Sequence, residues 1–214
     1  MGEPLVTPDV LGKGLLAQIA AQGGVRSYPA RTVLIREGDD SDTLFIVLKG
    51  RIKVYSTNEE GREMVIAVHG PGEYVGELAL DGGTRSASVM TLEPTACSVV
   101  SGAGLRDLTA AHPEFAEHLI EQLIWRVRQA TSTVKSLALE NVYTRLVRLL
   151  MDLSDAGDDG RRTVRERLTQ QDIADRIGSS REMVSRIVKD LTTGGYLAVE
   201  GDHIVVVRKP PAAW

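Results

Sequence analysis

The sequence predicts an α+β protein made of three consecutive parts. Short strand-like runs fill residues 25–100, a heptad pattern runs through residues 113–140, and two short amphipathic helices and a hairpin pattern follow. Regular short strands separated by turn residues are typical of a β-barrel (jelly roll) or a sandwich. We therefore expect a β-barrel over residues 1–112, a long helix over 113–140 and a winged helix-turn-helix over 141–214.

The barrel is indicated by apolar runs with glycine- or Asp/Asn-containing breaks between them. Gly38, Gly50, Gly72 and Gly76 stand in or near these breaks, where turns need a positive φ. The expected strands are TVLI, TLFIVL, RIKVYS, EMVIAVH, SASVMTL and ACSVV.

From Pro113 the pattern becomes that of a coiled coil. Leu119, Ile124 and Trp125 lie off its stripe, and we expect them to pack on the barrel. The alternative is an amphipathic helix packed only on its own barrel, but so narrow a stripe favours a second copy, and hence a homodimer. Heptad position a holds Ile120, Val127 and Val134, and position d holds Ala116, Leu123, Ala130 and Leu137.

Residues 168–191, LTQQDIADRIGSSREMVSRIVKDL, fit a helix-turn-helix. Counted from Gln170, the fifth, ninth and fifteenth residues are Ala174, Gly178 and Val184, which meet the needs for a small residue, a turn glycine and a branched apolar residue. An ordinary αα-hairpin is the alternative, but it does not explain the polar outer face of the second helix. That face carries Ser180, Arg181, Glu182, Ser185, Arg186 and Lys189.

These side chains suit double-stranded DNA. An arginine fork matches guanine in the major groove, and a glutamate accepts a hydrogen bond from cytosine. Thr169, Gln171 and Ser180 stand where phosphate contacts would hold the docked helix. The net charge of −4 does not oppose this, because acidic residues outnumber basic ones, 17 to 13, only in residues 1–137. In residues 138–214 each kind numbers 12.

Other features exclude some classes of protein. No apolar run is long enough to span a bilayer, so we expect no membrane partner. The single cysteine, Cys97, favours a reducing cytoplasm. A barrel-shaped enzyme of the cupin type would need a metal cluster, yet the four histidines are scattered over the chain. We therefore expect no catalytic residues and no metal.

The stretch GELALDGGTRSA, residues 76–87, sets Glu77 against Arg85 and Ser86. A surface ion pair would be worth little and would need no ligand. A guanidinium fork is also the group that best holds a phosphate, while a carboxylate accepts from a hydroxyl. We favour a pocket for an anion.

From about Val25 to its end, the chain resembles the cyclic AMP receptor protein (CRP/FNR) family of bacterial transcription regulators. The motifs that carry the resemblance are VGELAL…TRSASV and the helix-turn-helix stretch, in the family's order and with a coiled-coil helix between them. The resemblance implies a cyclic-nucleotide-binding sensor barrel, a dimerisation helix and a DNA-binding domain.

The resemblance also implies the role of each pocket residue. Arg85 and Ser86 would hold the cyclic phosphate, together with the backbone of Gly76, Glu77, Leu78 and Ala79. The carboxylate of Glu77 would take the ribose 2′-hydroxyl.

The nucleotide's base would be read on the long helix, where the family's cyclic AMP binders carry a Thr-Ser pair. An ungapped placement puts this pair at Ala130 and Thr131, which makes Thr131 the base contact and Ser132 a weaker candidate. The implied allosteric ligand is cAMP, with cyclic GMP and cyclic di-GMP as alternatives.

On DNA, Arg181, Glu182 and Arg186 match the family's base-reading triad, which implies half-sites close to TGTGA in a palindrome. RNA polymerase is the further partner that the resemblance implies. A repressor that binds DNA without any ligand is the alternative function.

Overall fold

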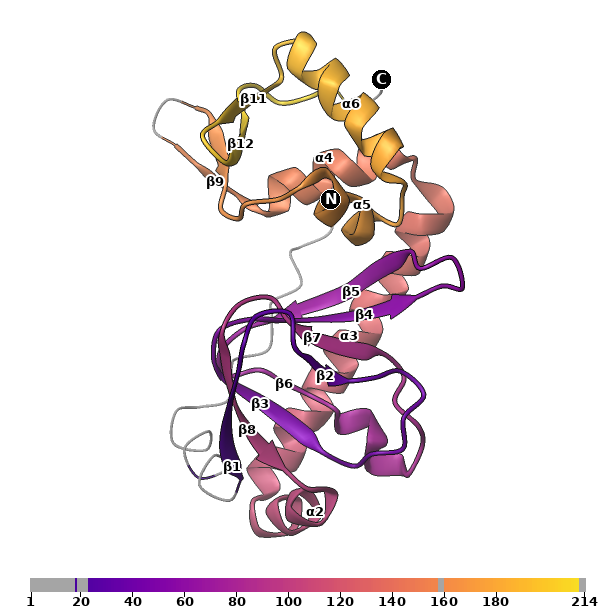
Figure 1. Cartoon of the computed structure of the whole chain (residues 1–214), viewed down its shortest axis with the longest axis vertical. Helices are drawn as coiled ribbons and strands as arrows, with labels where there is room; N and C mark the ends of the chain where they lie inside the picture. Colours follow the sequence, from indigo (N-terminus) through magenta and orange to yellow (C-terminus); the bar gives the residue numbers. More distant parts are fainter. Residues whose placement is uncertain (1–17, 19–22, 158–159, 212–214) are drawn as a thin grey trace. The chain divides into compact units, whose positions relative to one another are not determined.

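The computed structural model describes residues 18, 23–157 and 160–211 (Figure 1). The chain splits into two compact units, Met1–Asn58 with Val65–Ala130 and Glu59–Met64 with Thr131–Trp214. Antiparallel strands come first, a long helix follows, and a helix-turn-helix with its own small antiparallel sheet ends the order, so the predicted α+β class is confirmed. The predicted three-part boundaries stay a prediction, because the compact units divide inside the long helix.

The N-terminal strands form two four-stranded antiparallel sheets, and they include every run that the sequence predicted. One sheet has the order β1-β8-β3-β6 and the other β2-β7-β4-β5. The strands β1 and β6 were not among the predicted runs. The bounds are β1 Gly24–Tyr28, β2 Val33–Ile35, β3 Leu44–Lys49, β4 Ile52–Thr57, β5 Glu63–His69, β6 Tyr74–Val75, β7 Ser88–Thr91 and β8 Thr95–Val100.

Strand β3 is apolar from Leu44 to Leu48 because both of its faces are buried over Leu44 to Val47. Successive side chains of a strand point to opposite faces of the sheet. Phe45 and Val47 enter the core shared with Ile35 of β2, while Leu44 and Ile46 enter a second core with the helices that follow β8. The barrel is therefore packed on the inside and covered by helices on one side.

Two helices follow β8, namely α2, Gly102–Ala111, and α3, Pro113–Leu139. Of these two, only α3 was predicted from the heptad pattern. Phe115 and Leu119 of α3 pack in the second core, as expected for Leu119. The same expectation was wrong for Ile124, which is 49% exposed. It lies one residue after the d-position residue Leu123, so it borders the exposed a/d stripe rather than the barrel.

The second unit contains the helix-turn-helix and a four-stranded antiparallel sheet of order β11-β12-β10-β9. Strands β9 and β10, which include the two ends of the polar DAGDDGRR break, were not predicted. The bounds are α4 Val142–Asp152, β9 Ser154–Ala156, β10 Arg162–Val164, α5 Gln170–Ile177, α6 Arg181–Thr193, β11 Leu197–Glu200 and β12 His203–Val206.

The three diagnostic positions of the helix-turn-helix have the predicted environments. Ala174 and Val184 are fully buried in one core cluster. Gly178 ends α5 with φ 62° and ψ 53°, the left-handed conformation that favours glycine. The hairpin turn predicted at Glu200 to His203 is also present, since these two residues pair at the end of β11 and β12.

Candidate functional site

Arg85 lies buried just before β7, with a relative exposure of 4%. Its Nη1 donates to the carbonyl of Gly76 at 3.0 Å, and its Nη2 donates to the carbonyl of Thr43 at 2.6 Å and to Ser41 Oγ at 2.9 Å. Its Nε has no hydrogen-bond partner within the described part of the chain. The two Nη atoms of the guanidinium are therefore hydrogen-bonded, whereas the Nε–H donor finds no acceptor among the described residues.

Gly76 makes this arrangement possible. Its φ is +98°, a conformation that side-chain-bearing residues rarely adopt. A Cβ at this position would lie 2.5 Å from the Thr43 carbonyl oxygen and 2.7 Å from Arg85 Nη1. The glycine is therefore required both by the backbone conformation and by the close approach of the guanidinium.

The acceptors that touch Arg85 are neutral, so no contacting carboxylate cancels its charge. Burial lowers the pKa of Arg85, and the more distant charges of Asp42 and Glu77 oppose that shift. An arginine remains charged at neutral pH even so. A buried cation with an unsatisfied donor is a site suited to an anion.

Glu77 begins η1, the short 3-10 helix Glu77–Asp81, and is only 5% exposed. Its ion-pair partner is Arg126 of α3, through Oε1, and not Arg85. Its other oxygen, Oε2, is buried and has no hydrogen-bond partner among the described residues. Glu77 and Arg85 are thus separate groups, each with one buried atom left to satisfy.

Arg126 is the site residue that sequence reasoning missed. Its Nη2 donates to the Tyr74 carbonyl at 2.6 Å, and its guanidinium carbon lies 5.6 Å from the centre of the Tyr74 ring. The available signal was a cation on the helix face that otherwise packs on the barrel through Phe115 and Leu119. A charge in such a position needs a buried partner.

The other predicted ligand contacts are less enclosed. Leu78 is 53% exposed and Ser86 is exposed, while the side chain of Ala79 lies outside the described residues. Thr131 and Ser132 are exposed residues of α3 that belong to the second unit. Their contact with a ligand in the barrel stays a prediction.

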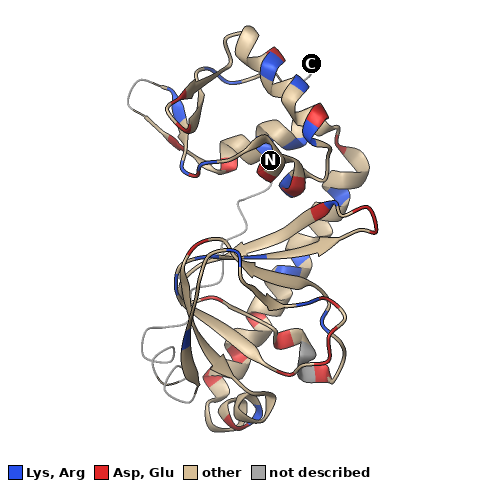
Figure 2. Cartoon of the chain, in the orientation of Figure 1, with Lys and Arg blue, Asp and Glu red and all other residues tan. Residues whose placement is uncertain are grey.

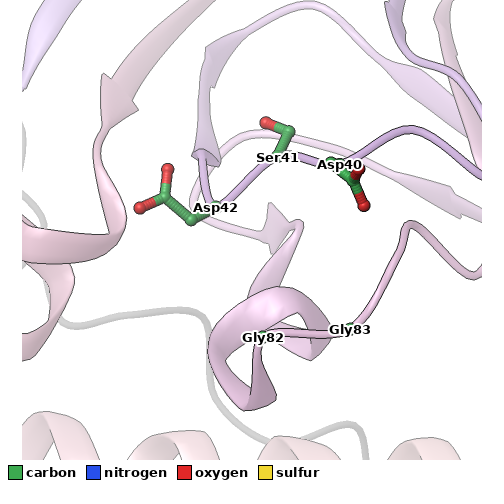
Figure 3. A pocket seen from close by; sticks show the side chains of 5 residues that line it. All are labelled: Asp40, Ser41, Asp42, Gly82 and Gly83. Carbon is green, nitrogen blue, oxygen red and sulfur yellow. The ribbon is translucent and has the colours of Figure 1, made fainter.

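An open hollow with a volume of about 280 Å³ lies beside the Arg85 site. The two share Ser41, which lines the hollow and accepts a hydrogen bond from Arg85. Its side chains point in different directions (Figure 3), and the carboxylates of Asp40 and Asp42 do not converge. Among the described residues, no group of three or more His, Cys, Asp or Glu side chains is placed to hold a metal ion. The lining residues are Asp40, Ser41, Asp42, Gly82 and Gly83.

In the second unit, α6 presents its predicted DNA-reading residues outward. Arg181, Glu182, Arg186 and Lys189 are exposed and Ser185 is half-buried. Acidic and basic residues are interspersed along the α6 ribbon (Figure 2). The pKa of Glu182 is lowered, first by a hydrogen bond from its own backbone N–H and next by the Ser180 hydroxyl, so it remains an acceptor at neutral pH.

The three predicted phosphate contacts also have local partners. Thr169 caps α5 in a reciprocal capping box with Asp172. Ser180 caps α6 by accepting from the Met183 N–H at 3.2 Å. Gln171 donates from Nε2 to Asp175 at 2.7 Å. The two hydroxyls therefore fix where the helices begin, and a role toward phosphate would come in addition.

Comparison with known proteins decides the family. Residues 25–112 match the model of the cyclic nucleotide-binding domain, and residues 144–212 match that of the Crp-like helix-turn-helix domain. The cAMP-activated global transcriptional regulator CRP of Haemophilus influenzae is 34% identical over 189 residues, which cover 85% of this chain and 83% of that protein. The chain belongs to the CRP/FNR family.

Two further CRP/FNR proteins bear on the ligand. The cAMP-activated regulator Vfr of Pseudomonas aeruginosa is 34% identical over 191 residues, which cover 85% of this chain and 88% of Vfr. The structure of the c-di-GMP-responsive global regulator CLP of Xanthomonas campestris has 29% identity and a TM-score of 0.83. It covers 92% of this chain and 100% of the CLP chain.

Membership of the CRP/FNR family confirms that the chain is a cyclic-nucleotide-responsive, DNA-binding transcription regulator and not an enzyme. Within the described part of the chain, no helix combines the length and the apolar character needed to cross a membrane.

Proposed function

We propose that this regulator binds cAMP in its barrel and, as a cytoplasmic homodimer, binds a palindrome with TGTGA-like half-sites. The observation that carries the ligand proposal is a set of buried polar atoms that find no hydrogen-bond partner among the residues that the structure describes: Glu77 Oε2, Arg85 Nε and Arg126 Nε. A buried polar atom left unsatisfied costs about 1–3 kcal/mol. A ligand that satisfies these atoms would recover that free energy.

The chemistry of these atoms fits a cyclic nucleotide. Arg85 offers a donor and an uncancelled positive charge to the cyclic phosphate. Glu77 offers an acceptor to a ribose hydroxyl, and Arg126 holds that carboxylate in place. Gly76 lets the chain approach closely on the same side. These residues recognise the phosphate and the sugar, and they leave the base undetermined.

The base is proposed from the relatives and from α3. Two relatives are named as cAMP-activated, which favours adenine. Cyclic di-GMP is the second candidate, because CLP is described as responsive to it and because Ala130 stands where a base-reading hydroxyl is expected. Thr131 and Ser132 would then contact the base from the helix.

The homodimer proposal is supported by the exposed face of α3. Ile120, Val127 and Val134 are 57%, 66% and 65% exposed, although all three are apolar. A repeat of apolar side chains at this spacing is stabilised when a second helix covers it. A twofold dimer would present two α6 helices to a palindrome. Contact with RNA polymerase stays a prediction.

Calorimetry tests the ligand. The full chain is titrated with cAMP, cyclic GMP and cyclic di-GMP, and binding of cAMP alone, or tightest, is the expected result. Arg85→Leu should abolish binding, because it removes the charge and the donors that face the phosphate. Tighter binding of cyclic di-GMP would favour the second candidate, and no binding of any of the three would refute a nucleotide ligand.

Fluorescence anisotropy with a TGTGA palindrome tests the regulation. The nucleotide should increase DNA affinity, since a ligand shifts an equilibrium only through its higher affinity for one state. Equal DNA affinity with and without nucleotide would instead support the ligand-independent repressor.

A further inference from the structure

The loop 38–43, between β2 and β3, makes hydrogen bonds to the main chain of Arg85 and also to its guanidinium. The Gly38 N–H donates to the Arg85 carbonyl at 2.8 Å, and the Arg85 N–H donates to the Asp39 carbonyl at 3.0 Å. Further along the same loop, Ser41 Oγ and the Thr43 carbonyl accept from Nη2. The orientation of Arg85 therefore depends on a segment that lies more than forty residues earlier in the sequence.

Ser41 is the one acceptor among these contacts whose identity depends on a side chain. The other acceptors of the guanidinium are the main-chain carbonyls of Thr43 and Gly76, which any residue would provide. A guanidinium is planar, and its five N–H donors have fixed directions. Because three acceptors fix the two Nη atoms, the same contacts also fix the direction of the Nε–H bond.

The structure assigns to Ser41 a positioning role: we propose that its hydroxyl orients the Arg85 guanidinium for the cyclic phosphate. This inference rests on the proposed nucleotide function and adds a residue that the motif GELALDGGTRSA does not contain. Asp42, the next residue, acts differently. Its carboxylate lies close to Gly102, where an added Cβ would come within 2.4 Å of Oδ2. It influences Arg85 by charge and forms no hydrogen bond that would orient it.

The position of Ser41 makes this role separable from a structural one. Ser41 is exposed and is one of the residues that line the open hollow (Figure 3). Removing its hydroxyl leaves no sealed cavity, and a cavity is what makes the truncation of a core side chain expensive. We therefore expect a substitution at Ser41 to change ligand affinity more than thermal stability.

The test uses the full chain and calorimetric titration with cAMP, with cyclic GMP and cyclic di-GMP titrated in parallel. Ser41→Ala should weaken binding about three- to tenfold, because one hydrogen bond to a charged group is lost while Thr43 still holds Nη2. Ser41→Thr keeps the hydroxyl and should bind like the natural protein, whereas Ser41→Val, of the same shape, should bind like Ser41→Ala. If Ser41→Ala fails to fold, the Ser41→Thr and Ser41→Val variants still compare the nucleotide affinity with and without the hydroxyl.

Ser56→Ala is the matched control. Ser56 lies on β4 and donates to Glu37 Oε2 at 2.6 Å, away from the guanidinium, so its loss should leave the affinity unchanged. A double-mutant cycle with Arg85→Lys then tests whether Ser41 affects nucleotide affinity through Arg85. If Ser41 acts through Arg85, Ser41→Ala should add less than a twofold loss in the Arg85→Lys background.

Two results would overturn the role of Ser41 while leaving nucleotide binding intact. One is equal affinity of the natural protein and Ser41→Ala, and the other is the same fold-loss in both Arg85 backgrounds. Absence of binding of all three nucleotides to the natural protein would overturn the proposed ligand as well.

Discussion

At the scale of single residues, the site separates two buried charges by giving them different partners. Glu77 shares its charge with Arg126, whereas Arg85 contacts only neutral acceptors. A direct Glu77–Arg85 pair would have cancelled both charges and left little attraction for an anion. The positive charge at Arg85 is thus left available for the proposed ligand, because Arg126 pairs with the acid nearby.

Gly76→Ala should disrupt this arrangement. Its Cβ would lie 2.5 Å from the Thr43 carbonyl and 2.7 Å from Arg85 Nη1, so Arg85 must move. We expect a loss of about 1–3 kcal/mol in stability from the strained backbone, and a loss of nucleotide binding from the displaced guanidinium. Gly61→Ala is the control, because φ is +76° but nothing lies within 4 Å. Denaturation and calorimetry measure both effects, and equal nucleotide affinity of the two variants would contradict the argument.

Glu73 makes a pH-dependent contribution at the turn before β6. Burial alone would raise the pKa of Glu73, but hydrogen bonds from His69 Nδ1 and the Gly70 N–H outweigh it, and the net pKa is lowered from 4.5. A group whose pKa is lower in the folded state contributes stability above its unfolded pKa and loses it as the pH falls through the folded pKa.

Glu73→Gln should therefore be less stable than the natural protein at neutral pH, and the difference should shrink as the pH falls below 4.5. Urea unfolding of both proteins over this range measures the difference. A gap that stays constant with pH would show that the carboxylate does not contribute through its charge.

At the scale of elements, the turn between α5 and α6 combines two demands on Gly178. Its φ is +62°, and an added Cβ would lie 2.9 Å from Cδ2 of Leu137, at the end of α3. The second clash is with a flexible side-chain end, so the backbone conformation is the greater obstacle. The capping box at Thr169 and the cap at Ser180 then set where each helix begins.

A left-handed conformation costs an ordinary residue roughly 1–2 kcal/mol. Gly178→Val should destabilise the second unit by more than this, because the valine side chain is branched at Cβ. Gly178→Asn should cost less, since asparagine tolerates this conformation. Chemical denaturation gives the ranking, and DNA affinity should fall in the same order. Equal stability of the two variants would argue against backbone strain as the cause.

Local patterns in the sequence predict the strands and the helix-turn-helix because their periodicity and turn residues are local properties. TLFIVL alternates between two buried faces, and Ala174, Gly178 and Val184 have the expected environments. The contacts that build the pocket are different, since Glu77 meets Arg126 and Ser41 meets Arg85 across more than forty residues. No local spacing encodes these contacts, so the acid and base of the motif were recognised without their partners.

At the scale of the whole molecule, one helix serves both compact units. The helix α3 runs from Pro113 to Leu139, and the units divide at Ala130 and Thr131 within it. Its N-terminal half packs on the barrel through Phe115, and its C-terminal end is held in the second unit by Arg148, which donates to Glu140 and Ser136. A ligand-dependent change in α3 therefore has a direct covalent path to the DNA-binding unit.

The exposed a and d stripe of α3 predicts the homodimer that we propose for DNA recognition. Val127→Glu should produce monomers in sedimentation experiments, because it places a charge where a second helix would cover an apolar side chain that is 66% exposed in the single chain. Arg128→Glu, one residue further and off the stripe, should remain dimeric. A palindrome is bound by two recognition helices, so only the Val127 variant should lose affinity for it. The monomer would still bind a single half-site, but it would no longer bind both half-sites together. A dimeric Val127→Glu protein with full palindrome affinity would place the dimer interface elsewhere on the molecule.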